Sequence, residues 1–304
     1  MNRARHQLVT RAAYDFGGVV SRWTLRALGV THDAIRHEVE AGRWLVIGNQ
    51  TVVPHTGDVS IEGRRWSAIW EIGRSITALD GVTALQAGGL RHYTDDELHV
   101  SVVHTAAVKK VPGVRLHKVI RRLPDEIMRA GVPRTKPPVA ALRGAYWAVS
   151  DRQAALILLM TVQQRLATPE QLLSWSKRLR GRRRRAFIED VLADLAGGAH
   201  SLGELDFARM CRQRGLPEPS RQVVRLGPKG RMYLDVRWKR YALVVEIDGA
   251  QHREGLAVTD DNLSRNAVTL QEEKVLRLDR IGLRLYEDEF MAQVARGLEF
   301  EQAA

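Results

Sequence analysis

The sequence has almost no cysteine and no long hydrophobic run, and these two absences exclude several kinds of protein. Cys211 is the single cysteine among 304 residues, so an internal disulfide and a thiolate zinc cluster are excluded and a reducing cytoplasm is the expected location. No apolar run approaches the roughly 18–20 residues that span a bilayer, and the N-terminus lacks a signal-type apolar core. We therefore expect a soluble, cytoplasmic protein with no membrane partner.

Positive charge is what the sequence has in excess. The formal net charge is +12, and the basic residues are spread along the chain with a peak at residues 177–185. The length suffices for about two domains, and the charge favours a polyanionic partner, above all nucleic acid. The basic peak includes Arg182 and Arg183, which either follow DNA phosphates or form a solvated surface between helices.

An acidic pattern lies in residues 234–249, which read as two strands rich in β-branched and aromatic side chains. With Lys239-Arg240 as a two-residue turn, Trp238 faces Tyr241 and Asp235 faces Val244. The apolar side chains then share one face, suited to a core covered by helices. They are Leu234, Val236, Trp238, Tyr241, Leu243, Val245 and Ile247.

The opposite face of this hairpin collects Asp235, Glu246 and Asp248. Glu246 is the diagonal neighbour of Asp235, roughly 7–8 Å away at the backbone, so both carboxylates can reach one ion. Hard cations such as Mg²⁺ or Mn²⁺ prefer carboxylate oxygens and are often completed by substrate phosphates. The pattern therefore predicts metal-dependent phosphodiester chemistry. Two alternatives stay open: the acids pair with Arg237 or another base, or a three-residue turn sends Asp235 to the opposite face.

These residues resemble the very-short-patch-repair branch of the PD-(D/E)xK nuclease superfamily, and within it the group called DUF559. The resemblance covers about the last hundred residues. The matching positions are Glu204, Asp235, Glu246-Ile247-Asp248-Gly249, His252, Asp260 or Asp261, Arg265-Asn266 and Leu270.

The resemblance implies a nuclease-like α/β core with roles for several of the matching residues. Asp235 and Glu246 would hold the divalent metal, Glu204 would support them from a helix, and His252 would assist proton transfer. The signature lysine of the superfamily falls on Asp248 here, and Lys274 or Arg265 would have to replace it. Arg265 would also contact the scissile phosphate. Glu204 has a second interpretation, as the closing residue of a capping box in which Ser201 begins a helix.

The N-terminal segment has the spacing of a helix-turn-helix followed by a hairpin. Ser21 and Thr31 are placed to cap two short helices, Gly29 lies between them, and Gly48-Asn49 is a hairpin turn. Residues 5–54 resemble the N-terminal winged helix of AbiEi-type antitoxins. The matching residues are Gly18-Val19-Val20-Ser21, Leu25, Leu28-Gly29, Ile35, Val39, Gly42-Arg43-Trp44 and Val52.

In a winged helix the second of these helices enters the DNA major groove. Arg36 and His32 are then candidates for base or phosphate contacts, and Arg43 and Arg22 for backbone phosphates. The alternative is that the module docks a protein and that Arg36 is a solvated helix residue.

The middle of the chain has no internal repeat and no recognisable catalytic triad. The pattern predicts a helix over 76–89, strands at 99–103 and 114–117, and helices from 139 to 166 and after Thr168. After the acidic hairpin we expect a helix over 259–270, a strand at 275–278, an edge strand at 282–286 and a last helix over 288–298.

Together these features predict a mixed α/β protein of three domains. Residues 1–57 would form a winged helix, 58–198 a helix-rich, AbiEi-like middle domain, and 199–304 a restriction-endonuclease-like α/β module. The expected function is binding of DNA, most simply double-stranded, and metal-dependent cleavage of its phosphodiesters. The alternative is a non-catalytic, antitoxin-like repressor with a vestigial nuclease fold and a cognate toxin as its partner.

Overall fold

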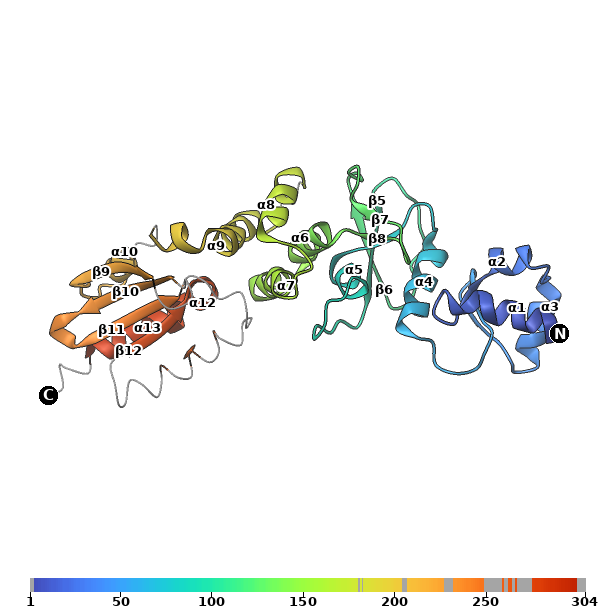
Figure 1. Cartoon of the computed structure of the whole chain (residues 1–304), viewed down its shortest axis with the longest axis horizontal. Coiled ribbons are helices and arrows are strands. Elements are labelled where there is room, and N and C mark those ends of the chain that lie inside the picture. Colours follow the sequence, from blue (N-terminus) through green and yellow to red (C-terminus); the bar gives the residue numbers. More distant parts are fainter. Residues whose placement is uncertain are drawn as a thin grey trace. The chain divides into compact units, whose positions relative to one another are not determined.

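The protein is a mixed α/β chain that divides into two compact units, Met1–Arg143 and Gly144–Ala304 (Figure 1). The computed structural model describes residues 3–179, 181, 183–203, 207–226, 232–248, 259, 262–263, 266 and 275–299. Within those residues no helix is both long and apolar enough to cross a membrane. The three predicted domains stay a prediction, because the contacts divide the chain only between Arg143 and Gly144.

The first unit begins with three helices and a small sheet in the strand order β1-β3-β2. Ser21 and Thr31 cap α2 and α3 as predicted, each accepting a hydrogen bond from the backbone N–H three residues on. Leu25, Ile35 and Trp44 are buried at the centre of this part. The elements are α1 (Arg3–Tyr14), β1 (Val20–Ser21), α2 (Arg22–Ala27), α3 (His32–Glu40), β2 (Leu45–Ile47) and β3 (Thr51–Val53).

The rest of the first unit surrounds a five-stranded sheet in the order β6-β5-β4-β8-β7. Strands β5 and β6 confirm two predicted strands, whereas the predicted helix over 76–89 is wrong in its first part. Residues 78–79 instead form β4, which pairs with β5, and the helix begins only after Asp80, which caps it by accepting from Gly81 N. The elements are α4 (Ile61–Ile72), β4 (Ala78–Leu79), α5 (Gly81–Ala87), β5 (Leu98–Val103), β6 (Val114–Val119), β7 (Ile127–Met128) and β8 (Arg134–Thr135).

The second unit begins in a run of helices, of which α9 crosses a predicted boundary. Because α9 continues to Gly203, the predicted division between 198 and 199 falls inside it, and the helix start predicted at Ser201 is wrong. Thr168 opens α8 with a capping box closed by Gln171. The helices are α6 (Pro137–Trp147, shared with the first unit), α7 (Asp151–Gln163), α8 (Pro169–Arg178), α9 (Arg185–Gly203) and α10 (Phe207–Gln213).

A four-stranded sheet in the order β12-β11-β10-β9 forms the remainder of the second unit, with β11 and β12 parallel and the other pairs antiparallel. The predicted edge strand at 282–286 is wrong: Asp279 accepts from Gly282 N and so caps a helix instead. The elements are β9 (Arg221–Leu226), β10 (Met232–Trp238), the 3₁₀ turn η2 (Lys239–Tyr241), β11 (Leu243–Asp248), β12 (Val275–Asp279), α12 (Arg280–Leu285) and α13 (Glu287–Glu299).

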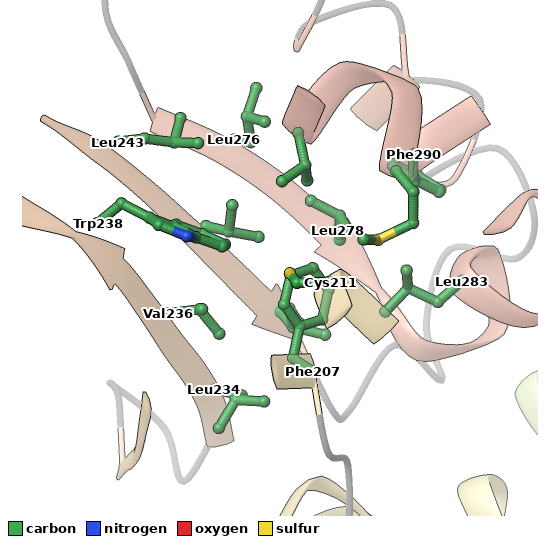
Figure 2. Packing of buried hydrophobic residues seen from close by; sticks show 14 of the residues in the cluster. Phe207, Cys211, Leu234, Val236, Trp238, Leu243, Leu276, Leu278, Leu283 and Phe290 are labelled. Atoms are coloured by element: carbon green, nitrogen blue, oxygen red, sulfur yellow. The ribbon is translucent and has the colours of Figure 1, made fainter. Parts of the chain in front are cut away.

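The core of this sheet lies on the face that the alternation predicts. Val236, Trp238 and Leu243 pack there against Phe207 of α10 and Phe290 of α13, as Figure 2 shows. Cys211 is buried in the same cluster, and burial raises the pKa of its thiol to about 11. Because helices cover this face, the side chains that alternate with it point to the other side of the sheet.

Candidate functional site

Asp235 and Glu246 lie directly opposite each other on the antiparallel strands β10 and β11. The predicted register was wrong by two residues, since Trp238 faces Leu243 and Asp235 faces Glu246. The connection is longer than a two-residue turn, because η2 and Ala242 in the left-handed region (φ 50°) join the strands. A shift of two residues keeps every side chain on its predicted face, so the two carboxylates are closer than predicted.

The same face of the sheet carries more charge on the neighbouring strand. Asp248 and Asp279 are partners on the parallel strands β11 and β12, and Arg277 is the partner of Glu246. Asp235, Asp248 and Asp279 are buried, at 7%, 8% and 3% exposure, while the Glu246 side chain is 41% exposed. The site is therefore a sheet surface on which three buried carboxylates and one half-exposed carboxylate meet.

Arginine side chains neutralise two of these carboxylates. Arg237 donates from Nε to Asp235 Oδ1 (3.1 Å) and from Nη2 to Oδ2 (3.0 Å). The Asp235 carboxylate, and secondarily the charge of Glu246, raise the pKa of Arg237. Arg277 Nε lies 3.5 Å from Glu246 Oε2. This arrangement is the alternative that the sequence left open, in which the acids pair with arginines.

Asp279 is an acidic residue that the sequence reasoning did not single out. It accepts hydrogen bonds from Thr259 Oγ1 (3.0 Å) and Gly282 N (2.7 Å). Burial raises the pKa of Asp279. The two hydrogen bonds lower this pKa, and the nearby charge of Asp248 raises it. Its signal in the sequence is an Asp three residues before a buried Gly282, the spacing of a helix N-cap.

Asn266, which belongs to the nuclease-like pattern, has a structural role. Its side-chain amide donates to Arg277 O (2.8 Å) and Gln293 Oε1 (3.0 Å), and its Oδ1 accepts from Arg277 N (2.8 Å). It is 1% exposed, so it ties the segment between β11 and β12 to the sheet. Of the predicted helix over 259–270 the structure describes Thr259, Asn262, Leu263 and Asn266, all helical.

Several predicted site residues fall outside the described residues, namely Glu204, His252, Arg265 and Arg182, together with Asp260, Asp261 and Lys274. Within the residues that are described, no group of three or more His, Cys, Asp or Glu side chains is arranged to hold a metal ion. Asp235 and Glu246 supply two oxygen donors from adjacent strands, which fits a cation that keeps several waters.

The exposed face of α3 carries more acid than base. Arg36 pairs with Asp33 (Nη2–Oδ1 3.0 Å) and with Glu40 (Nε–Oε1 3.8 Å), and all three side chains are at least 60% exposed. His32 is exposed at the start of the helix. One guanidinium thus faces two carboxylates, which weakens the attraction of this helix for phosphate.

The other two predicted phosphate contacts of the first unit, Arg43 and Arg22, differ in whether their side chains are already paired. Arg43 Nε contacts Glu38 Oε2 at 2.6 Å, and this guanidinium lowers the pKa of the buried Glu38 to about 2. Arg22 is half-buried at the start of α2, and its side chain has no hydrogen bond or ion pair with the described residues. Arg22 is therefore freer than Arg43 or Arg36 to meet an anion.

Part of the basic peak at 177–185 is used within the second unit. Arg178 stacks on Trp175, with 4.1 Å between the guanidinium carbon and the ring centroid. Arg184 donates to Asp151 Oδ1 (2.6 Å) and to Ala148 O (2.7 Å). Arg183 is exposed and has no hydrogen bond or ion pair with the part of the chain that is described. Residues 177–185 thus include arginines that stabilise the fold, Arg178 and Arg184, and one, Arg183, that is available to contact an anion.

Comparisons with known proteins assign no family. No family model matches the chain, and no curated protein matches it. Among solved structures it is similar to the crystal structure of the Rv2827c protein from Mycobacterium tuberculosis, with 17% sequence identity and a TM-score of 0.43 over 65% of this chain and 78% of that one. At this level the likeness carries no argument about function.

Proposed function

We propose that the protein binds DNA and that its C-terminal module hydrolyses phosphodiester bonds with a divalent metal ion. The observation that carries the proposal is the direct cross-strand pair of Asp235 and Glu246 on the sheet face opposite the core. Side chains so paired have Cβ atoms about 4.5–5.5 Å apart, close enough for both carboxylates to bind one Mg²⁺ or Mn²⁺.

In this proposal the described acidic residues bind the cation or lie beside it. Asp235 and Glu246 hold the cation, which when bound would polarise the phosphate and activate a water. Asp248, buried beside Asp279, lies at the end of β11 next to the pair. The resemblance to DUF559 nucleases adds Glu204 and His252 as supporting residues, and a cytoplasmic location suits a DNA substrate.

The N-terminal part contributes the DNA-binding role. The order α1, β1, α2, α3, β2, β3 is that of a winged helix, and the resemblance to AbiEi antitoxins points the same way. The net charge of +12 suits a polyanion. Arg22, His32 and Arg183 are the predicted contacts whose side chains make no hydrogen bond or ion pair with the described residues.

A second function, repression of a toxin-antitoxin operon without cleavage, is favoured by a specific observation. Arg237 and Arg277 already lie within ion-pair distance of the two carboxylates, so the site is neutralised without a metal. A protein of this kind would bind DNA and a cognate toxin, and its acidic face would only stabilise the fold.

Plasmid cleavage separates the two functions. Supercoiled DNA is incubated with the full chain and Mg²⁺ or Mn²⁺, and with EDTA as the metal-free reaction. Asp235→Asn and Glu246→Gln should each abolish cleavage, while Glu289→Gln, at an exposed acid of α13, should leave it unchanged. DNA retardation without cleavage by the wild-type chain would replace the nuclease with the repressor.

A further inference from the structure

The first unit contains a solvent-open cavity that neither proposed activity uses. Its volume is about 1110 Å³, and all its lining residues lie between Arg74 and Pro133. The start of β4, the end of β5 and the segment around β7 form its walls, since Ala78, Val103 and Ile127 line it. Small-molecule sites typically have volumes of about 300–1000 Å³, so the cavity is large enough for a ligand of that class.

Two of the lining residues are arginines that the described residues do not pair with. Arg74 and Arg129 are exposed and make no hydrogen bond or ion pair with the described part of the chain. Asp125, also exposed, is the one acid among the lining residues. The rim therefore presents a net positive charge to whatever enters.

A third arginine is held in place at the wall of the cavity. Arg122 Nη1 contacts Glu126 Oε1 at 3.1 Å, Nη2 donates to the backbone oxygen of Ser101, and the side chain is 22% exposed. Holding the guanidinium in advance lowers the entropy lost when it binds an anion.

The carboxylates behind Arg122 are shared with another arginine. Arg143 Nη1 contacts Asp80 Oδ2 at 2.8 Å, and Arg143 Nη2 contacts Glu126 Oε2 at 3.0 Å. Asp80 and Glu126 are both 0% exposed. The charges of Arg122 and Arg143 thus balance those of Asp80 and Glu126. Arg74 and Arg129 add positive charge that these two carboxylates do not neutralise.

The remaining lining is suited to an uncharged part of a ligand. Ile76, which is 39% exposed, lies with Val103 and Ile127 among the lining residues. Thr77 also lines the cavity and is 4% exposed, and its hydroxyl has no hydrogen-bond partner among the described residues. An unpaired buried hydroxyl is costly, and a ligand or water that bonds to it would remove the cost.

We propose that this cavity binds a nucleoside phosphate. Arg74, Arg122 and Arg129 contact the phosphate, as guanidinium groups do with paired donors. The base and sugar pack against the aliphatic wall. The same chemistry is available as a free nucleotide or as the phosphorylated end of a single strand.

Calorimetric titration of the full chain tests this proposal. The probes are the ribonucleoside mono- and triphosphates, pyrophosphate, adenosine, and a short single-stranded oligonucleotide with a 5′-phosphate or a 5′-hydroxyl. We expect a nucleoside phosphate to bind, adenosine to bind at least about tenfold more weakly, and Arg74→Ala or Arg129→Ala to weaken binding about tenfold. Arg121→Ala, at an exposed arginine outside the lining, is the matched control.

Each outcome of the titrations either supports or overturns nucleoside phosphate binding in the cavity. Binding of free nucleotide that falls in both cavity variants supports the proposal, and binding confined to the 5′-phosphorylated strand supports it with a chain end as the ligand. No binding of any nucleoside phosphate or 5′-phosphorylated strand, binding of pyrophosphate alone, or equal loss in Arg121→Ala overturns it. Thr77→Val keeps the side-chain shape, so reduced affinity in that variant without unfolding would support a hydroxyl contact. Failure of plasmid cleavage leaves these results untouched.

Discussion

Arg237 and Asp235 form a two-point ion pair from one strand, with their nitrogen and oxygen atoms 3.1 and 3.0 Å apart. Glu246 faces Asp235 from the next strand, so the Arg237 guanidinium is subject to the charge of both carboxylates. A divalent cation bound by the two carboxylates would have to compete with this guanidinium. The first prediction follows from that competition.

Replacing Arg237 with glutamine should raise the affinity for Mn²⁺ about fivefold, because the guanidinium that competes with the ion for Asp235 is removed. Calorimetry with Mn²⁺ measures the change. Arg296→Gln, at an exposed position of α13, is the control and should have no effect. If neither the wild-type chain nor Arg237→Gln binds the ion, the metal site has to be abandoned.

Arg143→Ala should cost about 3–5 kcal/mol in the free energy of unfolding of the first unit. The reason is that Asp80 and Glu126 are fully buried and would lose the more buried of the two guanidinium groups that contact both, leaving Arg122 alone. Denaturant unfolding followed by tryptophan fluorescence measures the loss. Arg121→Ala, at an exposed arginine, should change stability by less than about 0.5 kcal/mol. Equal effects of the two variants would contradict this account of the buried network.

Glu38 should make the stability of the first unit depend on pH in acid. Its folded pKa of about 2 is below the ordinary value of 4.5, so its ion pair with Arg43 stabilises the fold fully above pH 4.5. That contribution is lost as pH falls toward 2. Glu38→Gln should therefore cost about 1–2 kcal/mol at neutral pH and progressively less as pH falls from 4.5 to 2. Denaturant unfolding of the wild type and the variant from pH 2 to 7 checks this. A difference in unfolding free energy that stays the same at every pH would refute it.

A fragment that begins at residue 199 should be less stable than one that begins at residue 144. Helix α9 contributes Asp194, whose Oδ2 accepts from Arg284 Nε at 2.6 Å, and Asp190, which lies 2.9 Å from Arg284 Nη1. Removing α9 leaves Arg284 without both partners, at a cost of about 2–5 kcal/mol. Thermal unfolding by circular dichroism compares the fragments. Asp194→Asn in the whole chain should reproduce part of the loss, and two equally stable fragments would support the predicted boundary between residues 198 and 199.

If α3 contacts DNA, removing its acidic side chains should strengthen binding. Asp33→Asn combined with Glu40→Gln would free Arg36 and remove two repulsive charges, which we expect to raise duplex affinity by about tenfold at low salt. Arg36→Ala should weaken binding and reduce the salt slope by about 1. Electrophoretic retardation at several salt concentrations measures both. Unchanged affinity in all variants would remove α3 from the DNA interface.

Local structure was predictable wherever it depends on neighbouring residues. Ser21 and Thr31 cap their helices as predicted, since a side-chain oxygen needs only the N–H three residues ahead. Strand alternation likewise predicted which side chains of 234–248 reach the core, because the period of two holds for any register shifted by two. The same capping rule predicts Asp279 as the start of a helix. The residues that follow, 282–286, also fit a strand pattern, and the strand was predicted instead.

The amino-acid sequence by itself determined the mixed α/β class, the excess of positive charge and the common face of Glu246 and Asp248. Only the tertiary structure decided that Asp235 faces Glu246 directly, that Arg237 and Arg277 pair with them, and that Asp80, Glu126 and Arg143 meet in one buried network. The physical reason is range. Capping and alternation act over two to four residues, whereas register and buried ion pairs depend on how segments far apart in the chain pack together.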